Sequence, residues 1–280
     1  KNHYKEWKKS YQLEDALKTL NIIKKIKTNF TIVDHYGLSE SWHKKISKKN
    51  KLIVIDDFLN KKIFSDIYVN YHFLNKKDLI LKNIIKSKCT NLLGPKYALL
   101  NKIKNKKKNF MNKKVFIYLG SVDSKNVTTR LLNNLKSKKF KDYFFTVLIG
   151  KNNKNKKTII KDYKNINNFS LSIKNYKNLQ NFYKKNTYIF SGTGVTLYEQ
   201  IQCDCNVLSI FSNKNQKKLI QKLNDHNLCK IADIKDINQN LLVNFLNSKK
   251  NNKKKNYFDG NGPNRIFKYL KKINYKAQEI

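Results

Sequence analysis

The residues Ser191-Gly192-Thr193-Gly194 follow a short apolar run at 188–190 and precede a helical pattern at 195–202. Glycine occurs eight times in 280 residues, so two glycines around one threonine indicate a turn with special backbone requirements. The spacing is not G-x-G-x-x-G, because position 197 is leucine, and no Gly-Lys-Ser/Thr follows. What remains is a helix N-terminus whose amides, with Thr196 beside them, suit a diphosphate. A simple capped helix explains the same residues.

Glu199 lies five residues after Gly194, one turn into the expected helix. A carboxylate there would repel an adjacent phosphate but could accept hydrogen bonds from two vicinal hydroxyls. Diphosphate on the turn and ribose on Glu199 together describe a nucleoside diphosphate, whereas a surface glutamate is the alternative. Asn215 and Gln216 open the next helix after the apolar run at 207–211, at another strand end facing the same expected crevice.

Two further strand ends carry polar groups. Asp34, His35 and Tyr36 follow the apolar run Thr31-Ile32-Val33, where side chains after a parallel strand face a ligand crevice. Alternatively, Asp34 caps a helix that starts near residue 39. After the strand expected at 115–119, Gly120 and Asp123 could present amides to an anion. Alternatively, this is an ordinary strand–helix loop with Asp123 or Ser124 as the helix cap.

The elements that position these residues alternate between strand and helix along the chain. We expect strands at 30–34, 52–56, 67–70, 115–119, 144–149, 169–173, 188–190 and 207–211. We expect helices at 13–27, 39–48, 126–135, 176–185, 195–202, 216–226, 238–246 and 264–273. This alternation predicts an α/β fold with two Rossmann-like parallel sheets that face a cleft. The basic segments 101–114 and 249–255 read as linkers, so we expect domains at 1–105 and 112–248 and a terminal helix at 256–280.

The composition argues against several function classes. The net charge is +41, but of 60 basic residues only Arg130 and Arg265 are arginine, the side chain that forks onto phosphates and guanine. We therefore expect no nucleic-acid partner. No apolar run approaches the roughly 20 residues of a membrane span. The four cysteines show no metal-binding spacing, which predicts reduced thiols in a cytoplasmic protein with no metal and no cofactor (Cys89, Cys203, Cys205, Cys229).

Several motifs in order carry a resemblance to a known family. They are Trp7 with Asp15-Ala16, VDHYGL at 33–38, IDD at 55–57, LLGPKYALL at 92–100, LGSVDSKN at 119–126, SGTGVTLYE at 191–199, Asn215-Gln216, and DGNGPNRI at 259–266. Together they resemble the UDP-2,4-diacetamido-2,4,6-trideoxy-β-L-altropyranose hydrolases of pseudaminic acid biosynthesis, of the glycosyltransferase-B superfamily.

The resemblance implies that a UDP-sugar is the substrate and that water cleaves its anomeric C–O bond with inversion. It places the departing diphosphate on the turn after the strand at 188–190, ribose on Glu199, and the sugar near Asn215 and Gln216. Asp34, His35 and Tyr36 would face across the cleft from the first domain.

The family also begins with a strand and a glycine-rich loop carrying a histidine, and nothing before Trp7 matches them. The resemblance therefore implies an incomplete first domain and impaired catalysis, with His35 as a weak substitute base. A glycosyltransferase of the same fold and a basic nucleic-acid-binding protein are the alternative functions.

Overall fold

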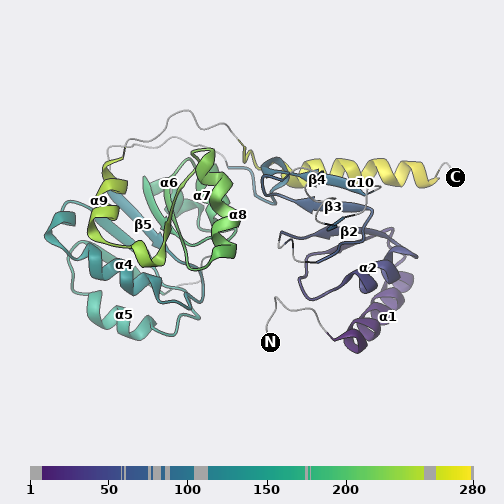
Figure 1. Cartoon of the computed structure of the whole chain (residues 1–280), viewed down its shortest axis with the longest axis horizontal. Helices are drawn as coiled ribbons and strands as arrows, with labels where there is room; N and C mark the ends of the chain where they lie inside the picture. Colours follow the sequence, from purple (N-terminus) through teal and green to yellow (C-terminus); the bar gives the residue numbers. More distant parts are fainter. Residues whose placement is uncertain are drawn as a thin grey trace. The chain divides into compact units, whose positions relative to one another are not determined.

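A computed structural model describes residues 8–57, 59, 61–74, 77, 83–85, 89–103, 113–173, 176, 178–248 and 257–278; at Lys9 and 272–278 it describes the backbone alone. The chain forms two compact units, Lys1–Asn101 with Gly260–Ile280 and Lys102–Asp259 (Figure 1). Each unit is built on a parallel sheet, which confirms the predicted two-sheet α/β fold. Trp7, the linker 249–255 and most of the linker 101–114 lie outside the described residues.

The sheet of the first unit has four strands in sequence order: β1 (Phe30–Val33), β2 (Lys51–Ile55), β3 (Ile67–Asn70) and β4 (Thr90–Leu93). Side chains along β2 alternate between two cores, as the period of a strand requires. Leu52 and Val54 pack toward α1 (Lys9–Ile26) and α2 (Glu40–Ser47), whereas Ile53 packs toward η1 (Pro95–Tyr97) and α10 (Gly262–Gln278). Helices therefore cover both faces of this sheet.

The last helix, α10, returns to the first unit. Arg265 donates to the carbonyl of Lys96 at 2.8 Å, and Ile266 is buried with Tyr97. Gly262 is required at this crossing, because a Cβ there would lie 2.1 Å from the carbonyl oxygen of Ala98. The final helix thus belongs to the core of the first unit.

The second unit has six parallel strands in the order β10-β9-β8-β5-β6-β7. They are β5 (Lys114–Tyr118), β6 (Phe144–Leu148), β7 (Phe169–Ser172), β8 (Tyr188–Ser191), β9 (Asn206–Phe211) and β10 (Lys230–Asp233). One face packs on α4 (Val127–Leu135), α5 (Lys156–Tyr163) and α9 (Gln239–Asn247), and the other on α6 (Gln180–Lys185), α7 (Thr196–Gln202) and α8 (Lys214–Asp225). Three short 3₁₀ segments complete the described helices (Pro95–Tyr97, Lys138–Phe140, Ile234–Asp236).

The strand order of the second unit reverses between β5 and β8. From β5 the chain moves outward through β6 and β7, then returns to the other side of β5 as β8. The loops after β5 and β8 therefore leave a topological switch point, the place where open α/β sheets bind ligands. The two loops also approach each other, since a Cβ on Gly192 would lie 3.4 Å from the carbonyl oxygen of Leu119.

Within the described residues, no helix combines the length and hydropathy needed to cross a membrane.

Candidate functional site

The turn between β8 and α7 lies at the switch point and contains four of the predicted residues, Ser191 to Gly194. Ser191 ends β8 fully buried, Thr193 is half-buried and Gly194 is exposed. The hydroxyl of Ser209 on β9 donates to the carbonyl of Gly192 at 3.1 Å, which ties the turn to the neighbouring strand. The helical hydrogen bonds begin with the amide of Leu197, which donates to the carbonyl of Gly194 at 2.9 Å. The amides of Thr193 to Thr196 precede that bond and are the donors that a helix start leaves without intrahelical partners.

The N-cap residue of α7, Val195, makes no side-chain cap hydrogen bond, and among the described residues no side chain accepts from the amides of Thr193 to Thr196. This distinguishes it from the other two helix starts at which we expected substrate. At α4, Asp123 accepts hydrogen bonds from the amides of Val127 at 2.8 Å and Thr128 at 2.9 Å, and it is buried with a left-handed φ of 43°. The carboxylate of Asp123 therefore fills the place that an anion would take at that helix. Gly120, also at positive φ, lies in the same loop with open space beside it.

The start of α8 is likewise closed by its own chain. Asn213 accepts from the amide of Gln216 at 3.0 Å, and the Gln216 side-chain oxygen accepts from the amide of Ser212 at 2.8 Å. This pair resembles a capping box, except that Gln216 accepts from the residue before the cap rather than from the cap itself. Gln216 is thus a capping residue here, while Asn215 is exposed beside it.

Glu199 lies half-buried one turn into α7. The hydroxyl of Tyr183, a buried residue of α6, donates to Glu199 Oε2 at 3.3 Å. Burial raises the pKa of Glu199, and the Tyr183 hydrogen bond lowers it by less. Burial and the charge of Glu199 raise the pKa of Tyr183, so its hydroxyl stays a donor. The carboxylate is held in one orientation beside the uncapped turn.

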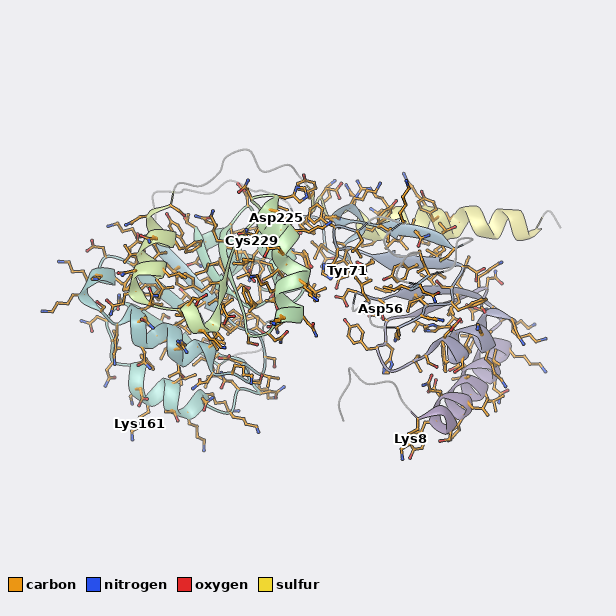
Figure 2. The ribbon with its side chains drawn as sticks, in the orientation of Figure 1. Lys8, Asp56, Tyr71, Lys161, Asp225 and Cys229 are labelled. Carbon is orange, nitrogen blue, oxygen red and sulfur yellow. The ribbon has the colours of Figure 1, made fainter. Side chains whose placement is uncertain are left out.

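In the first unit, the polar strand ends form a second cluster. Asp56 follows β2 and is buried, with Lys61 Nζ 3.6 Å from its Oδ2. Lys61 also donates to the carbonyls of Tyr36 at 2.7 Å and Leu38 at 2.8 Å, so it fixes the loop after β1 to the end of β2. Asp56 and Tyr71 lie at the same end of this sheet, as Figure 2 shows.

Asp57 is the centre of this cluster. Its Oδ1 accepts from the hydroxyl of Tyr36 at 2.5 Å, its Oδ2 accepts from the hydroxyl of Tyr71 at 2.7 Å, and His72 Nε2 lies 3.7 Å from Oδ2. Burial alone would raise the pKa of Asp57, but the nearby ring of His72 and the hydrogen bonds from Tyr36 and Tyr71 outweigh it and lower the pKa to about 2. Asp57 is therefore a fixed anion joined to the ends of β1 and β3.

Asp34 and His35 complete the cluster. Asp34 is exposed, and burial of part of its carboxyl together with the charge of Asp57 raises its pKa, against a smaller lowering by His35. The Nδ1 of His35 accepts from the amide of Gly37 at 3.0 Å. The neutral ring therefore carries its proton on Nε2, and its lone pair holds the turn instead of facing a water molecule. This geometry favours a structural role for His35 over the role of base.

The structure thus brings Asp34, His35 and Tyr36 together in one unit, and Gly120, Ser191 to Thr196 and Glu199 in the other. Sequence reasoning missed Tyr183, Tyr71, His72 and Lys61, and assigned no role to Asp57. The position of Tyr71 and His72 directly after β3 was the available signal, because carboxyl ends of parallel strands share one edge. Tyr183 had no such signal in the sequence, because it lies within a helix and not directly after a strand. Within the described residues, no group of three or more His, Cys, Asp or Glu side chains could hold a metal ion.

Comparisons with known proteins show the fold. No family model matches the chain. The uncharacterized protein MJ1062 of Methanocaldococcus jannaschii is 28% identical over 225 residues, which are 71% of this chain and 43% of that protein. The chain therefore spans less than half the length of this relative.

Among solved structures, the S. aureus MnaA–UDP co-structure matches with a TM-score of 0.71 and 12% identity over 97% of this chain and 82% of that chain. The UDP-GlcNAc 2-epimerase from Neisseria meningitidis bound to UDP-GlcNAc matches with a TM-score of 0.64 and 14% identity over 93% and 81%. At these identities the likeness shows the fold, two parallel-sheet α/β units of glycosyltransferase-B type.

Proposed function

We propose that this chain acts on a UDP-linked sugar and releases UDP by hydrolysis, with a 2,4-diacetamido-2,4,6-trideoxy sugar as the substrate. The observation that carries the proposal is the uncapped turn Ser191 to Gly194 at the switch point, followed by the oriented carboxylate of Glu199. The MnaA and N. meningitidis structures support it, since both were solved with a uridine nucleotide. The sequence motifs at 33–38, 119–126 and 191–199 support the hydrolase within this class.

In this proposal the amides from Thr193 to Thr196 bind the diphosphate. A helix N-terminus stabilises an adjacent anion by about 0.3–1 kcal/mol at an exposed site. Because the charge on the β-phosphate grows as the anomeric bond breaks, those donors lower the barrier to departure of UDP. Gly194 allows close approach, since its Cβ position meets nothing within 4 Å in the protein.

Glu199 binds the ribose in this proposal. Its Oε2 accepts a hydrogen bond from the Tyr183 hydroxyl. The carboxylate has further lone pairs that can accept hydrogen bonds from the two vicinal hydroxyls of the ribose. Hydrogen bonds to a charged group contribute about 1.5–3 kcal/mol each. Asp34, His35 and Tyr36 are assigned to the sugar, and Asn215, exposed at the start of α8, to the substrate side.

The test is calorimetry with UDP on the wild-type chain and on Glu199→Ala. We expect UDP binding to weaken about tenfold or more, while binding of inorganic pyrophosphate stays unchanged. Glu40→Ala removes a half-buried glutamate of α2 in the first unit and serves as the matched control. Absence of UDP binding, or equal binding by wild type and Glu199→Ala, would refute the nucleotide site.

The reaction itself is tested by product analysis. Incubation with the UDP-linked diacetamido sugar should release UDP and free sugar without an added acceptor. An intact but epimerised UDP-sugar, or UDP release only when an acceptor is added, would replace hydrolysis by another reaction at the same nucleotide site. The comparisons lend no support to nucleic-acid binding.

A further inference from the structure

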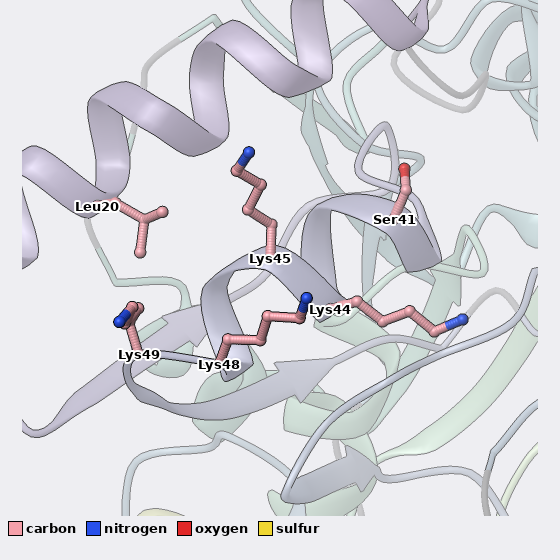
Figure 3. Close-up of a pocket in the computed structure, with 6 residues that line it drawn as sticks. All are labelled: Leu20, Ser41, Lys44, Lys45, Lys48 and Lys49. Carbon is pink, nitrogen blue, oxygen red and sulfur yellow. The ribbon is translucent and has the colours of Figure 1, made fainter.

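A groove between α1 and α2 in the first unit lies outside the proposed nucleotide site. It contains a hollow of about 430 Å³ lined by Leu20 of α1 and by Ser41, Lys44, Lys45, Lys48 and Lys49 on and after α2 (Figure 3). One wall is thus apolar and the other basic.

Leu20 is the apolar lining residue, and it belongs to a leucine stripe on α1 that extends beyond the hollow. Leu13 and Leu17 precede Leu20 at i−7 and i−3, so all three lie along one face of the helix. Leu13 is 51% exposed and Leu17 is 48% exposed, whereas Ala16 and Ile23 pack into the core of the unit. Leu13 and Leu17 are therefore exposed, while Leu20 is partly buried and also packs against that core.

The basic wall carries unneutralised charge. Lys44 pairs with Glu40 at 2.9 Å. For Lys45, Lys48 and Lys49, the described part of the chain provides no ion pair within 4.0 Å. Figure 3 shows these lysines on the α2 side of the hollow, with Leu20 opposite. Three positive charges beside an apolar stripe are complementary to a partner that carries negative charge and has an apolar face of its own.

The two walls are held at a fixed separation. Trp42 Nε1 of α2 donates to Asp15 Oδ1 of α1 at 2.9 Å. Gln12 Oε1 accepts from the Ser39 amide at 2.8 Å and from its hydroxyl at 2.6 Å. These bonds join the helices on their buried side, so the groove is preformed and a partner need not order it.

We propose that this groove binds an acidic amphipathic helix of a partner protein. Leucines of that helix would lie against Leu13, Leu17 and Leu20, and its carboxylates would face Lys45, Lys48 and Lys49, as in other helix-in-groove complexes. Charge complementarity selects this occupant. A second copy of the chain would bring a further net charge of +41 and would be repelled. A bilayer surface is flat and does not fit a hollow. A nucleic-acid backbone would pair with the lysines but would leave the leucines without an apolar contact.

The experiment uses fluorescence anisotropy with a synthetic peptide of about 18 residues that carries leucines at helical spacing and glutamates on one flank. A peptide of the same composition in scrambled order measures attraction to the general positive charge. We expect Leu13→Gln with Leu17→Gln, and separately Lys45→Glu with Lys48→Glu, to weaken the amphipathic peptide about tenfold or more.

Two matched controls come from the second unit. Phe144→Gln removes an exposed apolar side chain of β6, and Lys157→Glu with Lys161→Glu reverses two exposed charges on α5. Both should leave peptide affinity within about twofold. UDP calorimetry on every variant keeps this result separate from that of the nucleotide site.

The proposal is overturned if the scrambled peptide binds equally well or if the control variants weaken binding as much. It is also overturned if the same variants instead abolish binding to phosphatidylserine vesicles or a concentration-dependent dimer, because the occupant would then be a lipid surface or a second copy.

Discussion

Replacing Asp123 separates helix capping from ligand binding at the loop after β5. Its two carboxylate oxygens satisfy the amides of Val127 and Thr128 at 2.8 and 2.9 Å, and the side chain is 9% exposed. In Asp123→Ala both amides lose their acceptor at a buried helix start, and alanine must also adopt a φ of 43°. In Asp123→Asn one acceptor oxygen remains, and asparagine tolerates the left-handed region.

The expected magnitudes follow from these contacts. Loss of a helix cap costs about 1 kcal/mol, an unsatisfied buried donor about 1–3 kcal/mol, and a left-handed alanine about 1 kcal/mol more. Because water reaches the loop and part of these costs overlap, we expect Asp123→Ala to lower the free energy of unfolding of the second unit by about 2–4 kcal/mol. Asp123→Asn should cost about 1 kcal/mol.

Urea denaturation can assign the loss to the correct unit. Trp42 is buried in the core of the first unit, so in a Trp7→Phe background tryptophan fluorescence follows that unit alone. Far-ultraviolet circular dichroism follows both. We expect Asp123→Ala to shift the dichroism transition to lower urea and to leave the fluorescence transition in place.

A different result would refute the capping argument. If the Asp123 side chain faced the ligand instead of the amides of α4, Asp123→Asn would retain stability and change UDP affinity severalfold. Unchanged stability in Asp123→Ala would show that the two hydrogen bonds contribute nothing.

Three further predictions concern other buried features. Burial, and secondarily a neighbouring lysine, lowers the pKa of His43 to about 3. Since an unfolded histidine titrates near pH 6.5, the first unit should lose up to ~4 kcal/mol as pH falls from about 6.5 toward 3, and His43→Leu should flatten that loss in fluorescence-monitored urea titrations. Gly150→Ala places a Cβ 2.2 Å from a backbone oxygen of the loop after β5 and should destabilise the second unit by about 2 kcal/mol or more in thermal unfolding, whereas Gly194→Ala should stay within about 0.5 kcal/mol. Tyr71→Phe removes one donor to Asp57 and should raise its pKa by about one unit in a carbon NMR titration; an unchanged value would deny that this hydrogen bond holds the carboxylate ionised.

The sequence predicted the interior strands well because burial on both faces leaves near-continuous apolar runs, such as KLIVI in β2 and NVLSIF in β9. It missed β4 and β10, which are four-residue edge strands with only one buried side chain each. It also missed α5, where Ile159 and Tyr163 are the buried positions among lysines and the pattern is too short to detect. Edge position is not the reason that the two strands were missed, since the edge strands β1 and β7 were predicted. TNLL in β4 and KIAD in β10 lack both the near-continuous apolar run of FTIV in β1 and the alternation of FSLS in β7.

In the candidate site, too, the sequence predicts what local pattern and topology determine and misses what depends on packing between distant residues. Residues directly after a strand could be predicted, because topology alone brings carboxyl ends to one edge. The contacts that orient them could not. Tyr183 donates to Glu199 from another helix. Asp57 accepts hydrogen bonds from Tyr36, 21 positions before it, and from Tyr71, 14 positions after it. Such bonds depend on side-chain packing that no local pattern records.

Three helix starts in the second unit follow strand ends at which we expected substrate, and their caps distinguish them. The start of α4 is filled by the carboxylate of Asp123, and that of α8 by Asn213. At the start of α7 no side chain of the described residues provides a cap, and the strand before it stands at the reversal of strand order. A diphosphate placed at α4 or α8 would have to displace a cap, whereas at α7 it would supply one. Substitutions at Asp123 and Gln216 should therefore act mainly on stability and those at Glu199 mainly on UDP affinity; the opposite pattern would contradict a nucleotide site after β8.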